Sequence, residues 1–271
     1  MNNIPISFQV AILSKYPNAR NLRTPGICGS KKNVVFADID NKTLVFKFSN
    51  PNTIKKNFAV SQIYRDANIP APHITMGQYK DIFFEEYEIL SGKTLFEAIN
   101  DGMSADKIKQ IYREILHNIA KMQKLQPQLL EKYQHKHVHT ITNEQVTNVN
   151  NAVLGKICTA LVYMANYGNP KDLAVFHSDI TPKNIVVSTD GHLVGFLDLD
   201  SAVISNINYA FGTMAAKYQQ LGFNISELYD YFEGISDTKL NRTRINTLAN
   251  ISNIGKKMLW KHSQSKHKQY V

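Results

Sequence analysis

The sequence predicts an α+β protein with a small, mostly-β N-terminal lobe (residues 1–90) and a larger, helical C-terminal lobe (residues 91–271). Two observations predict this division. Short β-branched and aromatic runs, bounded by turn residues, dominate the chain up to about residue 90. Beyond that point, apolar residues recur at three- and four-residue steps, the period of a buried helix face. A chain of 271 residues is long enough for one or two such units.

In the first lobe, two strands are expected within residues 33–48, around a turn at 40–42. A helix is expected over residues 53–67, although its apolar residues are only loosely periodic. Two further strands are expected within residues 73–90. These elements make a small mixed lobe of strands and one helix.

In the second lobe, Ser104 is expected to cap a helix whose apolar face repeats at three- and four-residue steps. That face consists of Ile108, Ile111, Ile115, Ile119 and Met122. Further helices are expected over residues 153–164, 206–221, 226–233 and 238–262. The connection at 134–150 carries alternating His135, His137 and His139, and a solvated loop is favoured there over a metal site because no cysteine or acid pattern accompanies them.

Residues 177–200 are the most informative stretch of the chain. They contain a carboxylate, Asp179, an amide five residues later, Asn184, and a second carboxylate fourteen residues after that, Asp198. β-branched residues after Asn184 and an Asp-Gly turn predict a hairpin that returns Asp198 to the first two groups. Such a set suits phosphoryl transfer from a magnesium-bound nucleotide, because Asp179 can orient an acceptor hydroxyl while Asn184 and Asp198 offer the oxygen ligands that magnesium prefers.

The same stretch resembles the aminoglycoside phosphotransferase and choline kinase family of the protein-kinase-like superfamily. His177, Asp179 and Asn184 match its catalytic loop, in which the histidine is structural. Asp198-Leu199-Asp200 is similar to the small-molecule kinase branch, where an apolar residue and often a second acid follow the metal-binding Asp. Asp200 is interpreted as a contact to metal or acceptor, or as a helix cap. The resemblance covers roughly residues 26–202 and implies a two-lobed protein-kinase-like fold.

The resemblance also implies a nucleotide site with ATP and Mg²⁺ as cofactors. The turn at residues 29–36 is similar to the family's nucleotide-covering turn, and Lys47 falls on the strand that carries the phosphate-binding lysine. Adenine would be bound by backbone groups of the segment that joins the lobes. The candidate nucleotide-binding residues are Lys47, Ser30, Asn33, Glu88 and Leu90.

One feature departs from the kinase pattern. Kinases pair the strand lysine with a glutamate on the next helix, but no Asp or Glu occurs between Asp40 and Asp66. Asn57 falls near the expected place, so Lys47 lacks its usual partner unless a residue elsewhere replaces it. The acids of the hinge strand, Glu85, Glu86 and Glu88, are expected to be exposed charges rather than ligands.

Three functions are consistent with these residues. The first is an ATP-dependent kinase of a small hydroxylated molecule, with an amino alcohol, an aminoglycoside or another sugar as acceptor. The second is a protein kinase, opposed by the missing Phe-Gly after Asp198. The third is a nucleotide-binding pseudokinase, motivated by the missing helix glutamate. An acceptor site could involve Glu227, Asp230 and Glu233 with an aromatic wall of Tyr229, Tyr231 and Phe232, but an aromatic face buried in the core is favoured.

Composition sets the remaining limits. The net charge is +9, and residues 1–65 contain ten Lys or Arg but only two acids, which favours anionic ligands such as nucleotides. No nucleic-acid motif is present, and no apolar run approaches the roughly 18 residues of a membrane helix. Cys28 and Cys158 match no metal spacing and are expected to be free thiols. With no secretory signal at the N-terminus, a cytoplasmic protein is expected.

Overall fold

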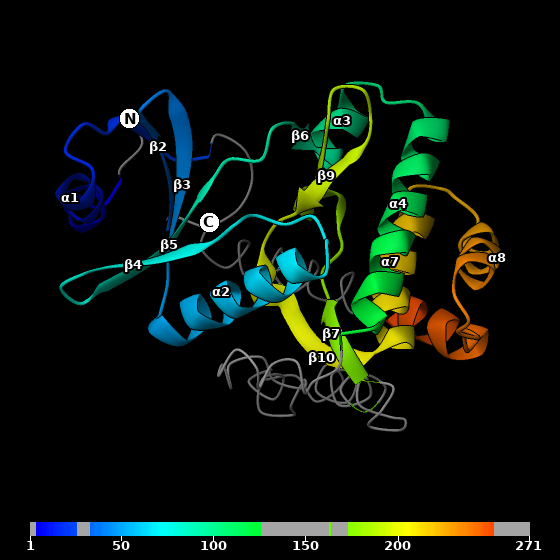
Figure 1. The fold of residues 1–271 in the computed structure, drawn as a ribbon. Helices are drawn as coiled ribbons and strands as arrows, with labels where there is room; N and C mark the ends of the chain where they lie inside the picture. The colour runs from blue at the N-terminus through cyan, green and yellow to red at the C-terminus, as the bar shows by residue number, and fades with distance from the viewer. Residues whose placement is uncertain (1–3, 26–32, 126–162, 164–172, 252–271) are drawn as a thin grey trace, which may run out of the picture.

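The first part of the computed structural model is built on one antiparallel sheet (Figure 1). The structure describes residues 4–25, 33–125, 163 and 173–251. In spatial order the strands are β1 (Arg20–Arg23), β2 (Val34–Ile39), β3 (Lys42–Phe48), β5 (Ile82–Glu88) and β4 (Thr75–Tyr79). Every neighbouring pair is antiparallel. Because β3 is the middle strand, Lys47 lies inside the sheet and not on an edge.

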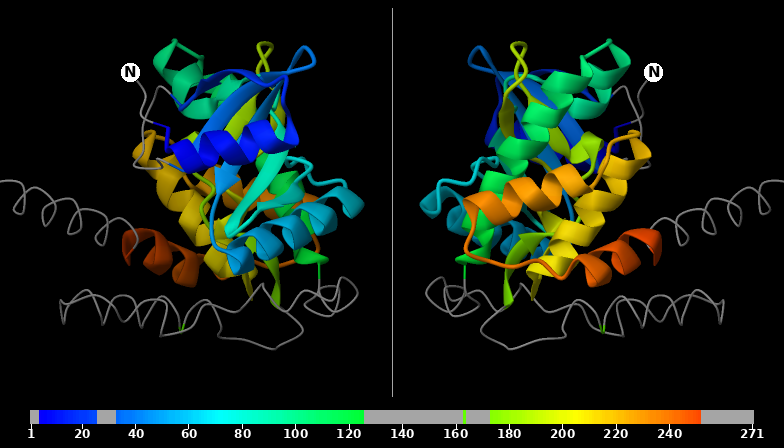
Figure 2. Two further views of the ribbon diagram at one scale, coloured as in Figure 1. Left: turned by 90° about the vertical axis from the view of Figure 1, so that its left-hand side faces the viewer. Right: turned by 90° about the vertical axis from the view of Figure 1, so that its right-hand side faces the viewer.

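Two helices cover the two faces of this sheet. Alternation along β3 and β5 puts Phe46 and Phe84 on one face, where they form a core with α1 (Ile6–Lys15). In the left view of Figure 2, α1 crosses this outer face. α2 (Pro51–Asp66) lies against the other face and begins where the Asn50 side chain accepts a hydrogen bond from the Thr53 backbone N–H. The face that carries Lys47 is therefore closed by α2.

The second part is mostly helical and has its own large core. Its helices are α3 (Leu95–Asn100), α4 (Ala105–Gln123), α7 (Ile207–Gln220) and α8 (Ser226–Ile235), and residues 242–251 are also helical. Two small sheets lie beside them: β6 (Lys93–Thr94), β8 (Ile185–Val187) and β9 (Leu193–Phe196) form one, and β7 (Leu173–His177) pairs with β10 (Ala202–Asn206). The core extends onto α2 through Val60, Ile63 and Tyr64, so this helix joins the two parts.

The connection between the two parts is short and sterically restricted. It runs from β5 through Ile89 to Gly92, which has a φ of +149°. A Cβ at this position would lie 2.2 Å from the Val187 carbonyl oxygen, so only glycine fits. The domain boundary near residue 90 stays a prediction. No helix in the described ranges is long and apolar enough to cross a membrane.

Most of the expected elements are confirmed, with differences where pairing is non-local. The expected helix over 206–221 starts at Ile207, because residues 202–206 form β10 against β7. The described part of the expected 238–262 helix is helical from 242 to 251. The expected 153–164 helix, the histidines at 135–139 and both cysteines lie outside the described residues. α1 was not predicted, because its apolar Ile6, Val10 and Leu13 are exposed and obscure its buried face.

Candidate active site

The predicted carboxylate and amide of the catalytic loop are in contact. β7 ends at His177, and Asp179 follows on the loop. Pro182–Asn184 form a 3₁₀ turn that brings Asn184 back over this loop. The Asn184 side-chain Nδ2 donates to the Asp179 carboxylate at 2.9 Å and to the Asp179 backbone carbonyl at 3.0 Å. The amide therefore holds Asp179 in one orientation.

His177 has the structural role that the sequence indicated. Its side chain is fully buried, and its Nε2 donates to the Leu197 carbonyl oxygen at 2.7 Å. Its Nδ1 accepts a hydrogen bond from the Asp179 backbone N–H at 3.3 Å. Burial lowers the pKa of His177, and the ring is accordingly neutral, donating from one nitrogen and accepting at the other. His177 thus joins the catalytic loop to the strand end that precedes Asp198.

The expected hairpin places Asp198 beside this loop. β8 and β9 pair antiparallel with Ile185 opposite Phe196, and the Leu197 N–H donates to the Asn184 carbonyl at 2.8 Å. Asp198 follows with φ 63° and ψ 54°, the left-handed region that non-glycine residues seldom occupy. Asp is one of the residues that tolerate this conformation. The backbone turns sharply there and leads into Asp200.

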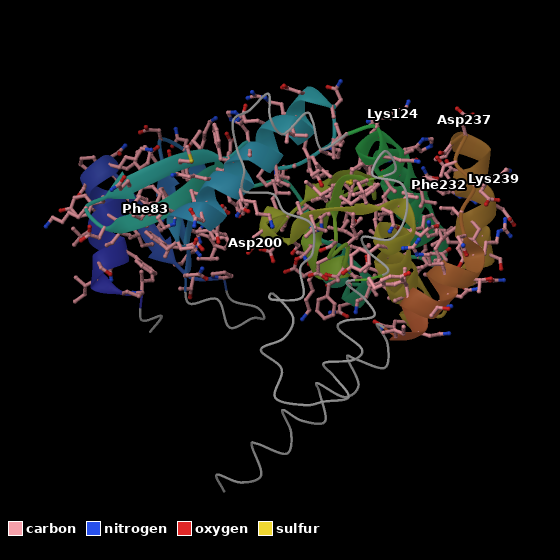
Figure 3. The ribbon with its side chains drawn as sticks, turned by 90° about the horizontal axis from the view of Figure 1, so that it is seen from below. Phe83, Lys124, Asp200, Phe232, Asp237 and Lys239 are labelled. Atoms are coloured by element: carbon pink, nitrogen blue, oxygen red, sulfur yellow. The ribbon has the colours of Figure 1, made fainter. Side chains whose placement is uncertain are left out.

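Lys47 of the first sheet reaches Asp198 and Asp200. Its Nζ lies 2.7 Å from Asp198 Oδ1, 3.1 Å from Asp200 Oδ1 and 3.9 Å from Glu85 Oε1. Burial lowers the pKa of Lys47, but the attraction of Glu85 and the two aspartates outweighs burial and the pKa is raised. The amine is therefore a buried cation. Figure 3 shows Asp200 at the junction of the two parts of the molecule.

The expectation that the acids of β5 are exposed is wrong for two of them. Glu85 and Glu86 are 3% and 7% exposed, because α2 and α1 cover the two faces of β5. Glu85 accepts a hydrogen bond from Asn57 Nδ2 at 2.6 Å, while Glu86 on the other face binds Lys15. Burial raises the pKa of Glu85 to about 7, although Lys47 and Asn57 both favour its ionised form.

As the sequence allowed, an acid outside the helix replaces the missing partner of Lys47. Glu85 faces it from the neighbouring strand, at the position directly opposite Lys47 in the β3–β5 ladder. The absence of any acid between Asp40 and Asp66 was the sequence signal that an acid elsewhere had to be found. The alternation along β5 does not by itself tell which face meets the lysine.

A second lysine, which the sequence did not single out, also faces this site. Lys56 on α2 donates from its Nζ to the Asp200 backbone carbonyl at 2.6 Å. Burial lowers the pKa of Lys56, and the neighbouring Lys47 lowers it further, while the attraction of Asp200 opposes the change. This contact ties α2 to the segment after Asp198.

The other described candidates for nucleotide binding make only local contacts within the protein. Asn33 Nδ2 donates to the Phe48 carbonyl at 2.6 Å, so this amide closes the end of the β2–β3 hairpin. The Glu88 side chain is exposed and pairs with Lys42 at 2.8 Å, and Leu90 lies against Gly195. Ser30 lies outside the described residues. Adenine binding by the backbone near Glu88 and Leu90 stays a prediction.

The helix α8 does not offer a free acidic or aromatic wall. Tyr229 and Phe232 are buried against Phe211, which confirms that this aromatic face is core. The acids of the helix are paired with basic residues: Glu227 with Lys109, and Asp230 and Glu233 with Arg242.

Comparison with known families decides what this arrangement is. The sequence profile of the phosphotransferase enzyme family (APH) matches residues 29–236. The chain belongs to this family. The match includes Lys47, Asp179, Asn184 and Asp198. A search of curated proteins found no match.

Solved structures show the same fold for this phosphotransferase. The GDP and kanamycin complex of APH(2″)-IIIa superposes with a TM-score of 0.70 at 11% identity, covering 98% of this chain and 95% of that one. APH(3″)-Id from Streptomyces rimosus, in complex with ADP and streptomycin, has a TM-score of 0.61 at 11% identity, covering 91% and 97%. Choline kinase LicA from Streptococcus pneumoniae has a TM-score of 0.55 at 14% identity, covering 94% and 91%.

The donor set of the phosphotransferase fits magnesium. Asp198 and Asp200 supply carboxylates, and Asn184 supplies an amide oxygen, all hard ligands of the kind that magnesium takes together with phosphates and water. Within the described ranges, no group of three or more His, Cys, Asp or Glu side chains is arranged to hold a metal by itself.

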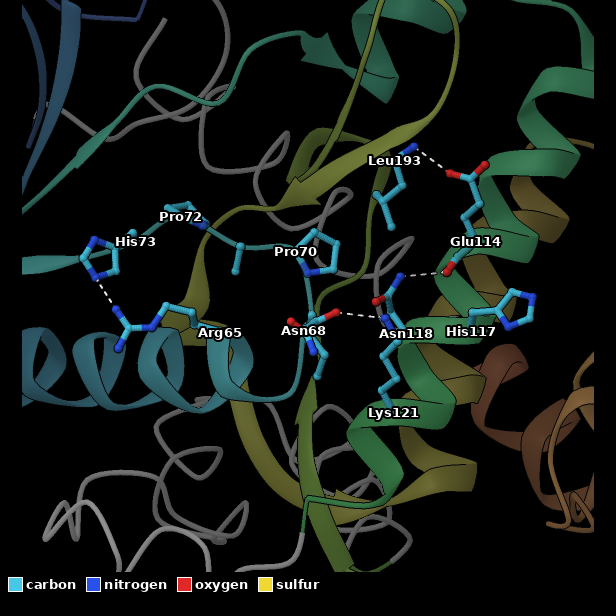
Figure 4. Close-up of a pocket in the computed structure, with 12 residues that line it drawn as sticks. Arg65, Asn68, Pro70, Pro72, His73, Glu114, His117, Asn118, Lys121 and Leu193 are labelled. Atoms are coloured by element: carbon cyan, nitrogen blue, oxygen red, sulfur yellow. Dashed lines mark hydrogen bonds between the residues drawn. The ribbon is translucent and has the colours of Figure 1, made fainter.

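A pocket of about 570 Å³ lies where α2, the loop after it, α4 and β9 meet (Figure 4). None of the predicted site residues lines it. Its basic groups are engaged within the protein: Arg65 contacts His73 at 2.6 Å, and Lys121 Nζ donates to the Asn68 carbonyl at 2.8 Å. The second contact ties α4 to the end of α2, so the pocket lies at the joint between the two parts of the molecule.

Proposed function

We propose that this phosphotransferase transfers the γ-phosphoryl group of magnesium-bound ATP to a hydroxyl group of a small molecule. The observation that carries the proposal is the convergence of Lys47 with three polar side chains of a distant segment, residues 177–200. Lys47 from the first sheet meets Asp198 at 2.7 Å, and the Asp179–Asn184 pair stands on the adjoining loop. Cation, metal-binding carboxylate and proton acceptor are the parts that phosphoryl transfer requires. We also propose that the protein is located in the cytoplasm.

In this mechanism, Asp179 receives the proton of the acceptor hydroxyl. The hydroxyl oxygen forms a bond to the γ-phosphorus as the bond from that phosphorus to the β–γ bridging oxygen breaks, and ADP leaves. Asn184 keeps Asp179 oriented through its 2.9 Å hydrogen bond. When bound, magnesium neutralises charge on the phosphates, and Asn184 and Asp198 are the residues that would hold it.

Lys47 supplies a fixed positive charge for the phosphates. Its Nζ is bound to Asp198 and Asp200. Phosphate oxygens would take the place of these carboxylates, because both are anionic acceptors of charge-assisted hydrogen bonds. The nucleotide would then lie between the first lobe, residues 1–90, and the second, residues 91–271.

The acceptor is proposed to be an amino alcohol, an aminoglycoside or another sugar. The similar structures include aminoglycoside complexes with kanamycin and streptomycin, and a choline kinase. The fold shared with these structures supports a small hydroxylated acceptor as a class. Because the sequence identities are only 11–14%, the comparison does not choose among these compounds.

The test is release of ADP from ATP, or of GDP from GTP, with magnesium and a panel of acceptors: choline, ethanolamine, kanamycin, streptomycin and simple sugars. Asp198→Ala is the inactive variant. Asp190→Ala is the matched control, because this exposed aspartate lies in the turn of the same hairpin. Turnover with one acceptor, lost in Asp198→Ala and kept in Asp190→Ala, supports the proposal. Turnover that survives Asp198→Ala contradicts it, and phosphorylation of proteins alone points to a protein kinase.

A further inference from the structure

The helix that lies over the Lys47 face of the sheet carries no acid that could pair with the lysine. α2 (Pro51–Asp66) has a single acid, at its last residue, and the side chain that faces the site from its middle is Asn57. Asn57 is fully buried, and its neighbour Lys56 contacts the Asp200 carbonyl. This helix therefore presents an amide and a cation where kinases present a glutamate.

The acid lies instead on the strand next to the lysine. Lys47 and Glu85 are directly opposite in the antiparallel β3–β5 ladder, so their side chains leave the same face of the sheet. Lys47 Nζ lies 3.9 Å from Glu85 Oε1, and Asn57 Nδ2 binds the other carboxylate oxygen at 2.6 Å. The Glu85 carboxylate is thus held between the lysine and the helix.

Glu85 differs from the two other acids around Lys47 because it is buried and does not lie on the segment that would bind a metal. Asp198 and Asp200 lie on the segment that would turn toward a metal, and their side chains are 23% and 32% exposed. The Glu85 side chain is 4% exposed and is covered by α2. When metal and phosphates engage the aspartates and the lysine, Glu85 is the described carboxylate that stays beside Lys47.

We propose that Glu85 is the positioning residue for Lys47, taking over from the strand the task that a helix glutamate has in other kinases. The inference rests on the proposed function, because it concerns the lysine of the nucleotide site. It has a consequence for control of the enzyme. Kinases can switch activity by moving the helix that carries the glutamate, but here lysine and acid are fixed in one sheet. Displacement of α2 would leave the pair intact, although it would remove the hydrogen bond from Asn57.

The first test is Glu85→Gln, which keeps the shape of the side chain and removes its charge. We expect kcat/KM for the nucleotide to fall by about 10- to 100-fold, the effect of a misplaced reactive group, and the nucleotide Kd to rise. Glu86→Gln is the matched control: it makes the same change at the next residue, which is also buried but faces α1. Its nucleotide kinetics are expected to stay within about twofold of the wild type.

The second test returns the acid to the helix. Asn57→Glu combined with Glu85→Gln keeps one carboxylate and one amide in contact beside Lys47, with their places exchanged. We expect the double variant to recover at least tenfold of the kcat/KM lost in Glu85→Gln. A merely structural role for Glu85 would change the Tm and not show this rescue. Glu85→Asp, which keeps the charge one methylene further from Lys47, is expected to lie between wild type and Glu85→Gln and replaces the latter if that variant does not fold.

Nucleotide affinity separates failure of this inference from failure of the proposed function. Titration with Mg-ATP, monitored by isothermal calorimetry, measures the nucleotide Kd at the Lys47 site without any acceptor. If the wild type binds Mg-ATP but turns over no acceptor, the proposed function fails, and weaker binding by Glu85→Gln still supports the role of Glu85. Folded Glu85→Gln that binds and turns over like the wild type overturns the inference. A folded double variant whose kcat/KM is no higher than that of Glu85→Gln also overturns the inference.

Discussion

The catalytic segment, residues 177–200, and the surroundings of Lys47 are built in opposite ways. In the first, loop, turn and hairpin follow one another along the chain, and contacts such as Asn184 to Asp179 span five residues. In the second, Lys47 meets Asp198 across 151 residues, and its pair Glu85 comes from another strand. The first region keeps the pattern of its family. The second departs from it, because the acid beside Lys47 comes from a neighbouring strand and not from the next helix. The difference teaches that a contact between distant segments can change its source of charge while a local motif stays the same.

The largest expected effect is loss of catalysis without loss of stability in the first region. Asp179→Asn removes the proton acceptor and keeps a side chain that can contact Asn184. We expect kcat to fall by about 10²- to 10⁴-fold, with an unchanged Tm and nucleotide Kd. Steady-state kinetics and thermal unfolding measure this. Asp190→Asn is the control. If Asp179→Asn lowered the Tm strongly as well as kcat, its kinetic effect could not be assigned to catalysis alone, and the prediction would be contradicted.

In the second region, a substitution is expected to change stability as well as activity. Lys47→Met leaves Glu85 buried without its cation, and removing one partner of a buried pair costs about 3–5 kcal/mol. Because Asp198 and Asp200 are partly exposed, we expect a value near the lower end, about 3 kcal/mol in the free energy of unfolding. Urea denaturation measures it. Lys42→Met, at an exposed lysine of the same strand, should change stability by less than about 1 kcal/mol.

The pH dependence of stability should differ in sign between the two regions. The pKa of His177 is lowered by burial, so the unfolded chain binds its proton more readily. Its contribution is complete above the unfolded value of 6.5 and is lost as the pH falls below it. We expect the stability difference between wild type and His177→Gln to shrink from pH 7.5 to pH 5.5 in urea titrations. A difference that grows toward acid would contradict the assignment of a neutral buried ring.

Glu85 should show the opposite trend. Burial raises its pKa to about 7 from 4.5, so the folded protein binds the proton more tightly. Stability is then lost as the pH rises from 4.5 through about 7, and Glu85→Gln, which cannot ionise, should lack this decrease. The same urea titrations at pH 5 and pH 8 measure it. Equal pH dependence in wild type and Glu85→Gln would show that the carboxylate is already ionised at pH 5.

Elements with a local signal were predicted well. The face of α4 from Ile108 to Met122 is buried as its period indicated, and Ser104 caps the helix. The β8–β9 hairpin follows from its β-branched strand and its turn. In contrast, β10 was not predicted, because its strand character comes from pairing with β7, with Ala202 opposite His177 and Asn206 opposite Leu173. α1 escaped prediction because its apolar residues point both inward and outward.

By itself, the sequence predicted that Asp179, Asn184 and Asp198 would lie close together. Their spacing sets a loop and a hairpin, and short-range backbone geometry is enough to bring such groups together. Only the tertiary structure decided which acid serves Lys47. Glu85 and Glu86 are adjacent acids of the same strand, and alternation sends one toward α2 and the other toward α1. Which of the two meets the lysine depends on the register of β3 against β5 and on the helix that covers each face, and both are set by contacts between distant segments.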